Sequence, residues 1–193
     1  MSNHFYAMMS RMKFIERWAL MRNSDRENIS EHSLEVAMIA QGLAIIGNAR
    51  FGKNYNAERC AVIALYHDCS EIITGDMPTP VKYYNSDIKS IYHEIEDKAN
   101  ENLLRMLPED ISAYYRQYFF KQDDDEELWK LVKAADKLSA LVKCIEEENF
   151  GNREFASAKE AAKLALINMH IPEADEFMRE FLPSYSLTLD NLR

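Results

Sequence analysis

Two histidines and two aspartates stand out, because each lies in a segment whose apolar residues repeat at helical spacing. His32 follows a Ser-Glu pair, His67 and Asp68 form a doublet, and Asp136 lies within Lys-Ala-Ala-Asp-Lys. A carboxylate at a core-facing helical position is rarely buried unless a cation is close to it. Each aspartate alone is more often a surface or capping residue. Together, the two carboxylates and the two imidazoles predict a shared cation.

This set of nitrogen and oxygen ligands would come from three separate segments of the chain. It suits manganese, cobalt, iron or zinc better than calcium. Four protein ligands on an octahedral ion leave two positions, where a water molecule and a substrate oxygen can bind side by side. A bound divalent cation lowers the pKa of that water enough to generate hydroxide near neutral pH. The ligand set therefore predicts metal-assisted hydrolysis.

The segments that must position these residues are predicted to be helical. Apolar residues recur three and four positions apart along nearly the whole chain, without strongly alternating runs bounded by hairpin turns. We expect a first apolar segment over 4–18, a helix that begins near Ser30 and stops at Gly47, and another that begins at Asn56 and ends at Thr74-Gly75. The two prolines that follow, at positions 78 and 80, predict an irregular loop.

The second half of the chain continues the helical pattern. An acidic run over 123–127 precedes the longest predicted helix, where negative charge suits the positive end of the helix dipole. The chain contains no linker, low-complexity tract or internal repeat. We therefore expect one all-α domain over residues 1–193, a bundle of roughly seven helices. The remaining helices are expected from Ser86 to Pro108, over 110–120, from Leu128 to Gly151, over 158–169 and over 173–181.

Composition excludes several classes of partner. The 193 residues carry a formal net charge of −9, which argues against nucleic-acid polymers because these require a basic surface. A small anion could still bind where a metal ion and a few Arg or Lys side chains reverse the local potential. Apolar stretches are short and interrupted, so we expect no membrane segment and a cytoplasmic protein. The 3 cysteines form no CxxC pair and are expected to be reduced thiols.

The order His32, His67-Asp68, Asp136 resembles the H…HD…D signature of the HD superfamily of metal-dependent phosphohydrolases. The chain more closely resembles the bacterial 5′-deoxynucleotidase family often called YfbR, over essentially its whole length. An HD doublet alone is a weak signal, whereas the doublet with ordered ligands on either side and a TGDMPTPVK run is a strong one. The motifs that carry the resemblance are Arg17-Trp18, Ser30-Glu31-His32-Ser33, Tyr66-His67-Asp68, Ser70-Glu71, Thr74 to Lys82 and Ala135-Asp136.

The resemblance implies an HD-type helical bundle that hydrolyses deoxyribonucleoside 5′-monophosphates to deoxyribonucleoside and phosphate, and it implies a homodimer. It also implies one divalent metal ion per chain, either cobalt, manganese or another transition metal. The implied metal ligands are His32, His67, Asp68 and Asp136. The expected substrate contacts are Arg17, Trp18, His32, Asp68, Asp76, Met77, Pro78, Thr79 and Asp136. The expected catalytic residues are Arg17 and Glu71.

Several of these residue types suit the implied roles. Arg17 offers a rigid planar fork of donors to a phosphate. Glu71 follows His67 by four residues and Asp68 by three, so on one helix it would share their face. It could then orient the attacking water or protonate the leaving 5′ oxygen. Asp76 only accepts hydrogen bonds, which suits a sugar hydroxyl.

Two residues have alternative interpretations. From periodicity alone, Trp18 ends an apolar helix face and fits a core position. Beside Arg17, and given the resemblance, it fits a wall against the sugar. Lys82 is either solvated or adds positive charge near the phosphate.

Two other functions also stay open. The chain could be an HD phosphohydrolase that acts on a cyclic or pyrophosphorylated nucleotide, or an HD module that binds a nucleotide or a protein without turnover. A ligand set for one metal and the Arg17-Trp18 pair favour the monoester over the first alternative. A module without turnover would be expected to lack a ligand or the nearby acid Glu71, and this chain has them all.

Overall fold

A computed structural model of the chain describes residues 3–82 and 84–193. Within these residues the secondary structure consists of α and 3-10 helices, with a single isolated antiparallel bridge between Glu16 and Asn28 and no strand. The all-α prediction is therefore confirmed. None of the described helices combines the length and apolarity needed to span a bilayer.

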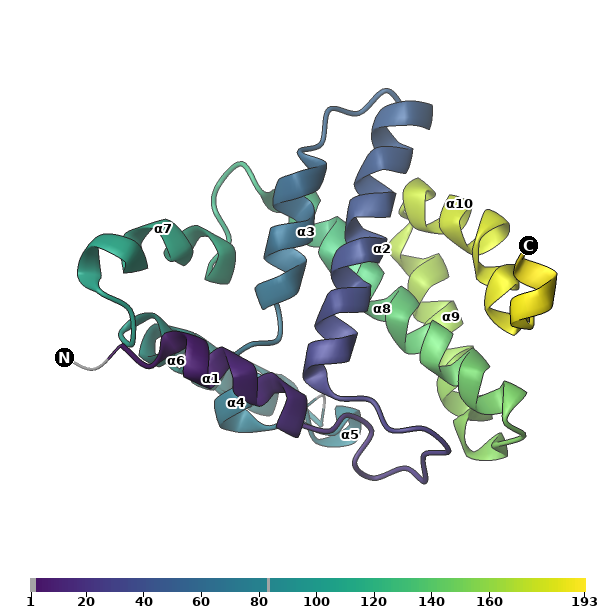
Figure 1. Ribbon diagram of the computed structural model, residues 1–193, viewed down its shortest axis with the longest axis horizontal. Coiled ribbons are helices and arrows are strands. Elements are labelled where there is room, and N and C mark those ends of the chain that lie inside the picture. The colour runs from purple at the N-terminus through teal and green to yellow at the C-terminus, as the bar shows by residue number, and fades with distance from the viewer. Residues whose placement is uncertain (1–2, 83) are drawn as a thin grey trace.

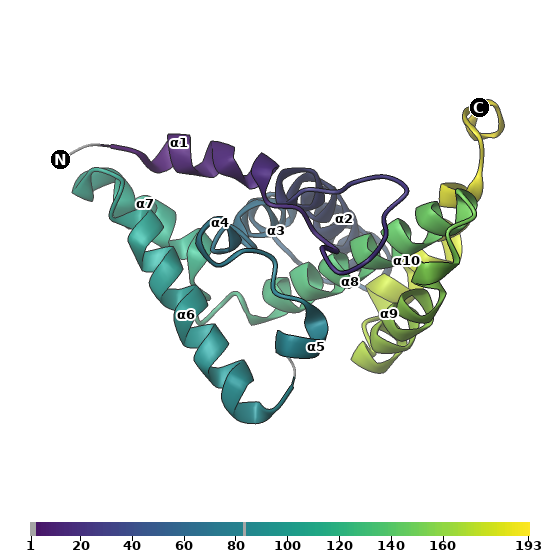
Figure 2. The same ribbon diagram turned by 90° about the horizontal axis from the view of Figure 1, so that it is seen from below.

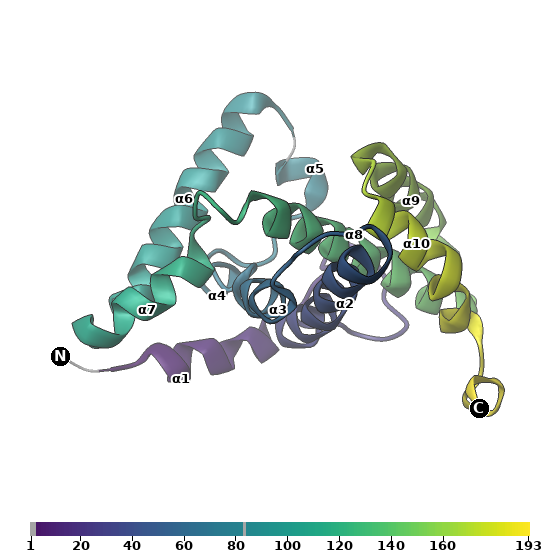
Figure 3. The same ribbon diagram turned by 90° about the horizontal axis from the view of Figure 1, so that it is seen from above.

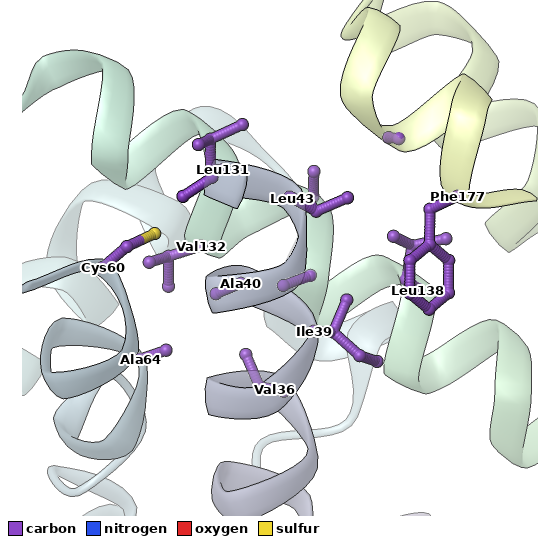
Figure 4. Close-up of a cluster of buried hydrophobic side chains, with 14 of the residues drawn as sticks. Val36, Ile39, Ala40, Leu43, Cys60, Ala64, Leu131, Val132, Leu138 and Phe177 are labelled. Carbon is purple, nitrogen blue, oxygen red and sulfur yellow. The ribbon is translucent and has the colours of Figure 1, made fainter. Parts of the chain in front are cut away.

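Three helices form the centre of the molecule: α2 (Ile29–Arg50), α3 (Ala57–Tyr66) and α8 (Glu126–Asn149). They pack against one another around a core of aliphatic side chains, with α2 and α3 side by side and α8 crossing behind both (Figure 1). Figure 4 shows Val36, Ala40 and Leu43 of α2 in this core, close to Ala64 of α3 and Val132 of α8. This layer places residues of α2 and α8 near the C-terminal end of α3.

Two further groups of helices flank this layer on opposite sides (Figures 2 and 3). One side carries α9 (Ala156–Met169), α10 (Pro172–Glu180) and the 3-10 helices η2 (Arg153–Phe155), η3 (Leu182–Ser186) and η4 (Leu189–Leu192). The other side carries α1 (Phe5–Met9), η1 (Ser10–Phe14), α4 (Glu71–Thr74), α5 (Thr79–Lys82), α6 (Ser86–Leu104) and α7 (Glu109–Phe119). This second side has its own apolar cluster, which includes Phe5, Ile29, Cys69, Leu103 and Phe119.

The predicted bounds of α2 were wrong at both ends. Asn28, not Ser30, caps the helix, because its side chain accepts the N–H groups of Ser30 and Glu31 while Glu31 accepts the N–H of Asn28. Gly47 does not stop the helix, which continues to Arg50. A Cβ at Gly47 would lie 2.6 Å from the Tyr55 ring, so this glycine serves close packing.

Three other predicted elements differ from the structure. The helix expected from Asn56 to Thr74 is interrupted, because α3 ends at Tyr66 and a turn over 67–70 precedes α4. The apolar segment over 4–18 ends its helical part at Phe14, and residue 15 is extended. The loop expected around the two prolines contains α5, since Pro80 is the second residue of that single turn, where a missing N–H costs no hydrogen bond.

Candidate metal centre

Four side chains from three parts of the fold converge at one place. His32 lies on the first turns of α2, Asp136 lies midway along α8, and His67 and Asp68 lie in the turn after α3. One potential ligand atom from each residue lies within 4.8 Å of all the others. The interruption after α3 therefore places the doublet in a turn, not within a helix as predicted. The structure nevertheless brings the four residues together.

Hydrogen bonds orient both imidazoles. The Nδ1 of His67 lies 2.7 Å from the carbonyl oxygen of Ala64, which can only accept, so this nitrogen carries a proton. The Nδ1 of His32 lies 3.0 Å from the Oγ of Ser139, and that hydroxyl donates to the Oε2 of Glu35 at 2.5 Å. Since the Ser139 proton is committed to Glu35, the Nδ1 of His32 is the donor. In both rings the Nε2 lone pair is left free for a metal.

Both Nε2 atoms point at carboxylates. The Nε2 of His32 lies 3.4 Å from Asp68 Oδ2 and 3.3 Å from Asp136 Oδ1, and the Nε2 of His67 lies 3.1 Å from Asp68 Oδ2. Both nitrogens are buried and have no hydrogen-bond partner among the described residues. Two buried nitrogen lone pairs and two carboxylates at this spacing fit a divalent transition metal.

Without a cation, the electrostatics of the cluster favour a protonated His32. Burial and Arg17 oppose that charge, but the nearby carboxylates of Asp136 and Asp68 raise the pKa of His32 to about 9. Although burial raises the pKa of both aspartates, the histidines hold that of Asp68 far below its usual range, and His32 and Lys137 hold that of Asp136 low as well. The site is thus poised to keep both carboxylates ionised, the form that binds metals.

Arg17 borders the cluster. Its Nη1 lies 3.6 Å from Asp68 Oδ2, and its side chain is only 10% exposed. Its Nε donates to Glu27 Oε2 at 3.0 Å. The guanidinium therefore lies beside the four potential ligands with its Nε already paired.

Trp18 does not end a helix, and its backbone has a left-handed φ of 59°. Its N–H donates to Asp76 Oδ2 at 3.2 Å, and its indole N–H donates to Glu27 Oε2 at 2.9 Å. Its ring is tilted against Phe155, with centroids 5.3 Å apart. A left-handed φ is unusual for an aromatic residue and concentrates at functional sites. The structure thus joins Arg17, Trp18 and Asp76 through direct contacts.

The other residues of the expected substrate loop lie between α4 and α5. Met77 and Pro78 are half-buried in this segment. The side chain of Thr79 lies outside the part of the chain that the structure describes.

Glu71 is the first residue of α4, and its side chain is 4% exposed. Burial, together with the charges of Asp68 and Asp76, raises its pKa to about 10 against the opposing charges of Arg17 and Lys82. Its Oε2 is buried and has no hydrogen-bond partner among the described residues. The carboxyl group is therefore a neutral acid close to the cluster, although the helix expected to carry it is interrupted.

The Lys82 side chain is partly buried, and its ammonium group forms an ion pair within the fold. Its Nζ lies 2.8 Å from Glu96 Oε1 and 4.7 Å from the centroid of the Tyr92 ring. Its positive charge acts on Glu71 and is opposed by Glu96, so it is partly neutralised within the fold.

Sequence reasoning missed three residues that contact the site: Glu27, Glu35 and Ser139. Glu35 follows His32 by three residues and Ser139 follows Asp136 by three, so each shares a helix face with an expected ligand. That spacing was a usable signal. Glu27 lies in a loop, where no periodicity marks it.

Comparisons with known proteins agree with this geometry. A family model described as 5′-deoxynucleotidase YfbR-like matches residues 4–185. The 5′-deoxynucleotidase of Vibrio vulnificus strain YJ016 is 49% identical over 190 residues, which are 98% of each chain. An HD-domain phosphohydrolase from Listeria innocua has a TM-score of 0.83 at 25% identity, over 96% of this chain and 90% of its own.

A more distant structural relative is the HD phosphohydrolase of cyanophage S-2L, solved with dA and one catalytic Zn²⁺ ion. Its TM-score is 0.65 at 20% identity, over 94% of this chain and 96% of its own, which is a likeness of fold. The family match and the nearly full-length similarity to the Vibrio enzyme carry the assignment. The chain belongs to the 5′-deoxynucleotidase YfbR-like family of HD-domain phosphohydrolases.

Proposed function

We propose that His32, His67, Asp68 and Asp136 hold one divalent transition metal ion, at which this 5′-deoxynucleotidase hydrolyses deoxyribonucleoside 5′-monophosphates. The observation that carries the proposal is the pair of buried Nε2 atoms, from His32 and His67, that face two carboxylates and make no hydrogen bond within the described residues. Cobalt, manganese or zinc suits this donor set. When bound, the ion would supply Lewis acidity and lower the pKa of water.

Arg17 is proposed to bind the 5′-phosphate. Its Nε is occupied by Glu27, so the Nη donors are the ones available, and Nη1 already faces the cluster. A guanidinium fork matches two phosphate oxygens, and its charge offsets the acidic surroundings. This contact would fix the phosphorus atom beside the metal ligands.

Glu71 is proposed to donate the proton that the reaction requires. Water attacks the phosphorus atom, the bond between phosphorus and the 5′ oxygen breaks, and its electron pair stays on that oxygen. A neutral carboxylic acid can protonate the oxygen as it leaves, and the proton that the attacking water gives up returns the carboxylate to its acid form, which yields the deoxyribonucleoside and phosphate. Burial, the largest cause of the raised pKa of Glu71, acts whatever the charge of Asp68, so the acid form is favoured.

Trp18 and Asp76 are proposed to recognise the sugar. Asp76 uses Oδ2 to accept the Trp18 N–H, which leaves Oδ1 able to accept a sugar hydroxyl. The indole lies next to Arg17 in sequence and is fixed at its nitrogen by Glu27. A rigid flat ring at this place could exclude a 2′-hydroxyl. Met77, Pro78 and Thr79 would complete this side of the pocket.

We also propose one HD-type domain over residues 1–193 and a homodimer. The dimer is supported by α2, which presents three apolar side chains to solvent: Leu34, Met38 and Ile45, each more than half exposed. Their spacing of four and seven positions places them on one side of the helix. Met38→Glu should shift the protein toward monomer in sedimentation, whereas Leu164→Glu, at an exposed apolar position of α9, should not. Equal behaviour of the two variants would argue against this face.

The experiment that tests the function is phosphate release from a panel of deoxyribonucleotides, ribonucleotides, cyclic nucleotides and nucleoside diphosphates. The chelated protein is assayed alone and after addition of cobalt, manganese, magnesium or zinc. We expect metal-dependent release from dAMP and dTMP. Preference for a cyclic or pyrophosphorylated substrate, or binding of dAMP without turnover in every metal, would overturn the proposal.

A further inference from the structure

We infer that Glu27 is the positioning residue that holds Arg17 and Trp18 in one fixed arrangement, so that phosphate binding and sugar discrimination depend on a single carboxylate. The inference rests on the proposed function of those two residues. One oxygen, Oε2 of Glu27, accepts both the Nε–H of Arg17 at 3.0 Å and the indole N–H of Trp18 at 2.9 Å. No other carboxylate in the described part of the chain accepts from both.

The environment of Glu27 makes these contacts strong. Its side chain is 12% exposed and that of Arg17 is 10% exposed, so water competes little for either charge. Hydrogen bonds between ionised groups are roughly twice as strong as neutral ones. Because Glu27 binds the Nε edge of the guanidinium, the plane of the fork is set and its Nη edge is turned toward Asp68.

The backbone around Glu27 is fixed as well. Its carbonyl oxygen accepts the N–H of Arg17 at 2.9 Å, and the N–H of Ile29 donates to Ile15 at 2.9 Å. Glu16 and Asn28 form the isolated bridge between these two short segments. Since Asn28 caps α2, Glu27 lies directly before the helix that carries His32. The carboxylate is therefore tied to the cluster through rigid structure.

Trp18 depends on such support, because its left-handed backbone is costly. A non-glycine residue in this region is held there only where its surroundings determine it. Asp76 accepts the Trp18 N–H, Met21 and Asn23 donate to its carbonyl oxygen, and Glu27 accepts from the indole. The first three contacts fix the backbone. Only Glu27 among these fixes the rotation of the ring.

A residue with this role predicts a joint defect. Truncation of Glu27 releases the Nε edge of the guanidinium, so that the fork is no longer held in one orientation, and frees the indole to rotate out of its place. The affinity for the phosphate and the discrimination against the 2′-hydroxyl should then fall together, although Glu27 would contact neither the phosphate nor the sugar. Its Oε1 lies 3.7 Å from the Nδ1 of His32, beyond hydrogen-bond distance, so metal binding should be retained.

The test compares Glu27→Ala and Glu27→Gln with Glu16→Ala. Glu16 is the matched control, because it lies on the same short segment as Arg17 and pairs with Arg26 at the surface. For each variant we would measure metal content, KM and kcat for dAMP, and the ratio of kcat/KM for dAMP to that for AMP. We expect Glu27→Ala to keep its metal, raise KM by about 10-fold or more and lower the dAMP/AMP ratio by about 10-fold. Glu27→Gln should lose less of both, since its amide oxygen can still accept, and Glu16→Ala should match the parent protein.

Normal KM and normal selectivity in a metal-bound Glu27→Ala would overturn the inference. So would a loss of kcat alone, or a defect in Glu16→Ala as large as that in Glu27→Ala. If Glu27→Ala is poorly folded, a double-mutant cycle with Glu27→Gln tests the same inference. In an Arg17→Ala background, Glu27→Gln should no longer raise KM. Increases in KM that add across the two substitutions would contradict the inference. Failure of the parent protein to hydrolyse dAMP would instead refute the proposed function, and the two failures are thus distinguishable.

Discussion

The backbone N–H of Trp18 donates to the Oδ2 of Asp76 at 3.2 Å, across 58 positions of sequence. This contact joins the segment that carries Arg17 to the segment between α4 and α5. Both segments are loops, and loops placed by a rigid scaffold commonly carry binding residues. The phosphate side and the sugar side of the proposed pocket are therefore held together by one hydrogen bond to a strained backbone.

This link leads to a prediction about sugar selectivity. Trp18→Ala should narrow the preference for dAMP over AMP, chiefly by raising the rate with AMP, because the ring that excludes the 2′-hydroxyl is removed. An apolar pocket alone rejects an added hydroxyl by about 10² at most, so a larger parent ratio requires a wall. Trp18→Phe keeps a ring but loses the indole N–H, so its preference for dAMP over AMP should lie between that of the parent protein and that of Trp18→Ala. The measurement is kcat/KM for both nucleotides.

The control for this prediction is Trp129→Phe, which changes the other tryptophan of the chain, on α8. Its ratio should equal that of the parent protein. If the parent protein hydrolyses dAMP and AMP equally well, Trp18 is no wall and the assignment of its role is wrong.

The metal ligands can be tested by removal of one carboxylate at a time. Asp68→Ala and Asp136→Ala should each lose bound metal and turnover, since each removes one of four ligands, while helical circular dichroism stays close to that of the parent. Chelation of the parent protein should abolish activity, and added metal should restore it. Metal content by elemental analysis is the decisive measurement. Near-normal rates in either variant would remove that residue from the ligand set.

Ser139 is expected to act on the metal through His32. Its hydroxyl accepts from Nδ1 of His32 and donates to Glu35, which fixes the tautomer that leaves Nε2 free. Partners of this kind typically contribute 10–100-fold to metal affinity. Ser139→Ala should therefore lower the metal affinity by about 10–100-fold in a competition titration. The effect on activity should be smaller when the metal is saturating. Ser33→Ala is a matched control, because Ser33 is also a buried serine of the core but makes no side-chain hydrogen bond with any described residue.

The four potential ligands could be found from sequence because each lies in or beside a strongly periodic segment. A charged residue on an apolar helix face is conspicuous in such a segment. When two such helices pack together in the core, the polar residues on their apolar faces come close to each other. His32 and Asp136 are of this kind, on α2 and α8. Glu27 and the turn at Arg17 had no comparable signal, since their contacts form between loops and depend on the tertiary structure.

The end of α3 also could not be predicted from the local sequence. Neither glycine nor proline occurs between Asn56 and Thr74, so local propensity gives no reason for the helix to stop. It stops where Cys69 enters the second apolar cluster beside Ile29 and Leu103. Burial in that cluster outweighs continuation of the helix, and the same turn carries His67 and Asp68. Tertiary packing therefore decided both the element boundary and the position of the doublet.

Glu71 should affect the chemical step more than binding. Glu71→Gln keeps the shape of the side chain but cannot give up a proton, so kcat should fall by about 10²–10⁴-fold with metal still bound. Because the acid form is the active one, the rate of the parent protein should decline at alkaline pH, as the raised pKa of Glu71 is approached. That decline should be absent from Glu71→Gln. Glu94→Gln, at an exposed position of α6, should keep both the rate and the profile, and an unchanged kcat in Glu71→Gln would exclude Glu71 as the acid.

Glu147 should make the stability of the protein depend on acidic pH. It is fully buried on α8, where it accepts from Lys143 at 2.6 Å, from the N–H groups of Ser24 and Asp25, and from Asn152. These contacts anchor the loop that connects Trp18 to Glu27. Burial alone would raise the pKa of Glu147, but the hydrogen bonds lower it to about 2, from a usual value of 4.5.

A carboxyl group with a lowered pKa stabilises the folded state above its unfolded pKa, and this contribution is lost as pH falls toward the folded value. The full contribution is about 3 kcal/mol, of which about 2 kcal/mol should disappear between pH 7 and pH 3. Urea denaturation should therefore show a difference in unfolding free energy between the parent protein and Glu147→Gln that shrinks by this amount over that range. Glu160→Gln, at an exposed position of α9, should differ little from the parent at either pH. A difference for Glu147→Gln that stays constant with pH would mean that the ionised carboxylate does not stabilise the anchored loop.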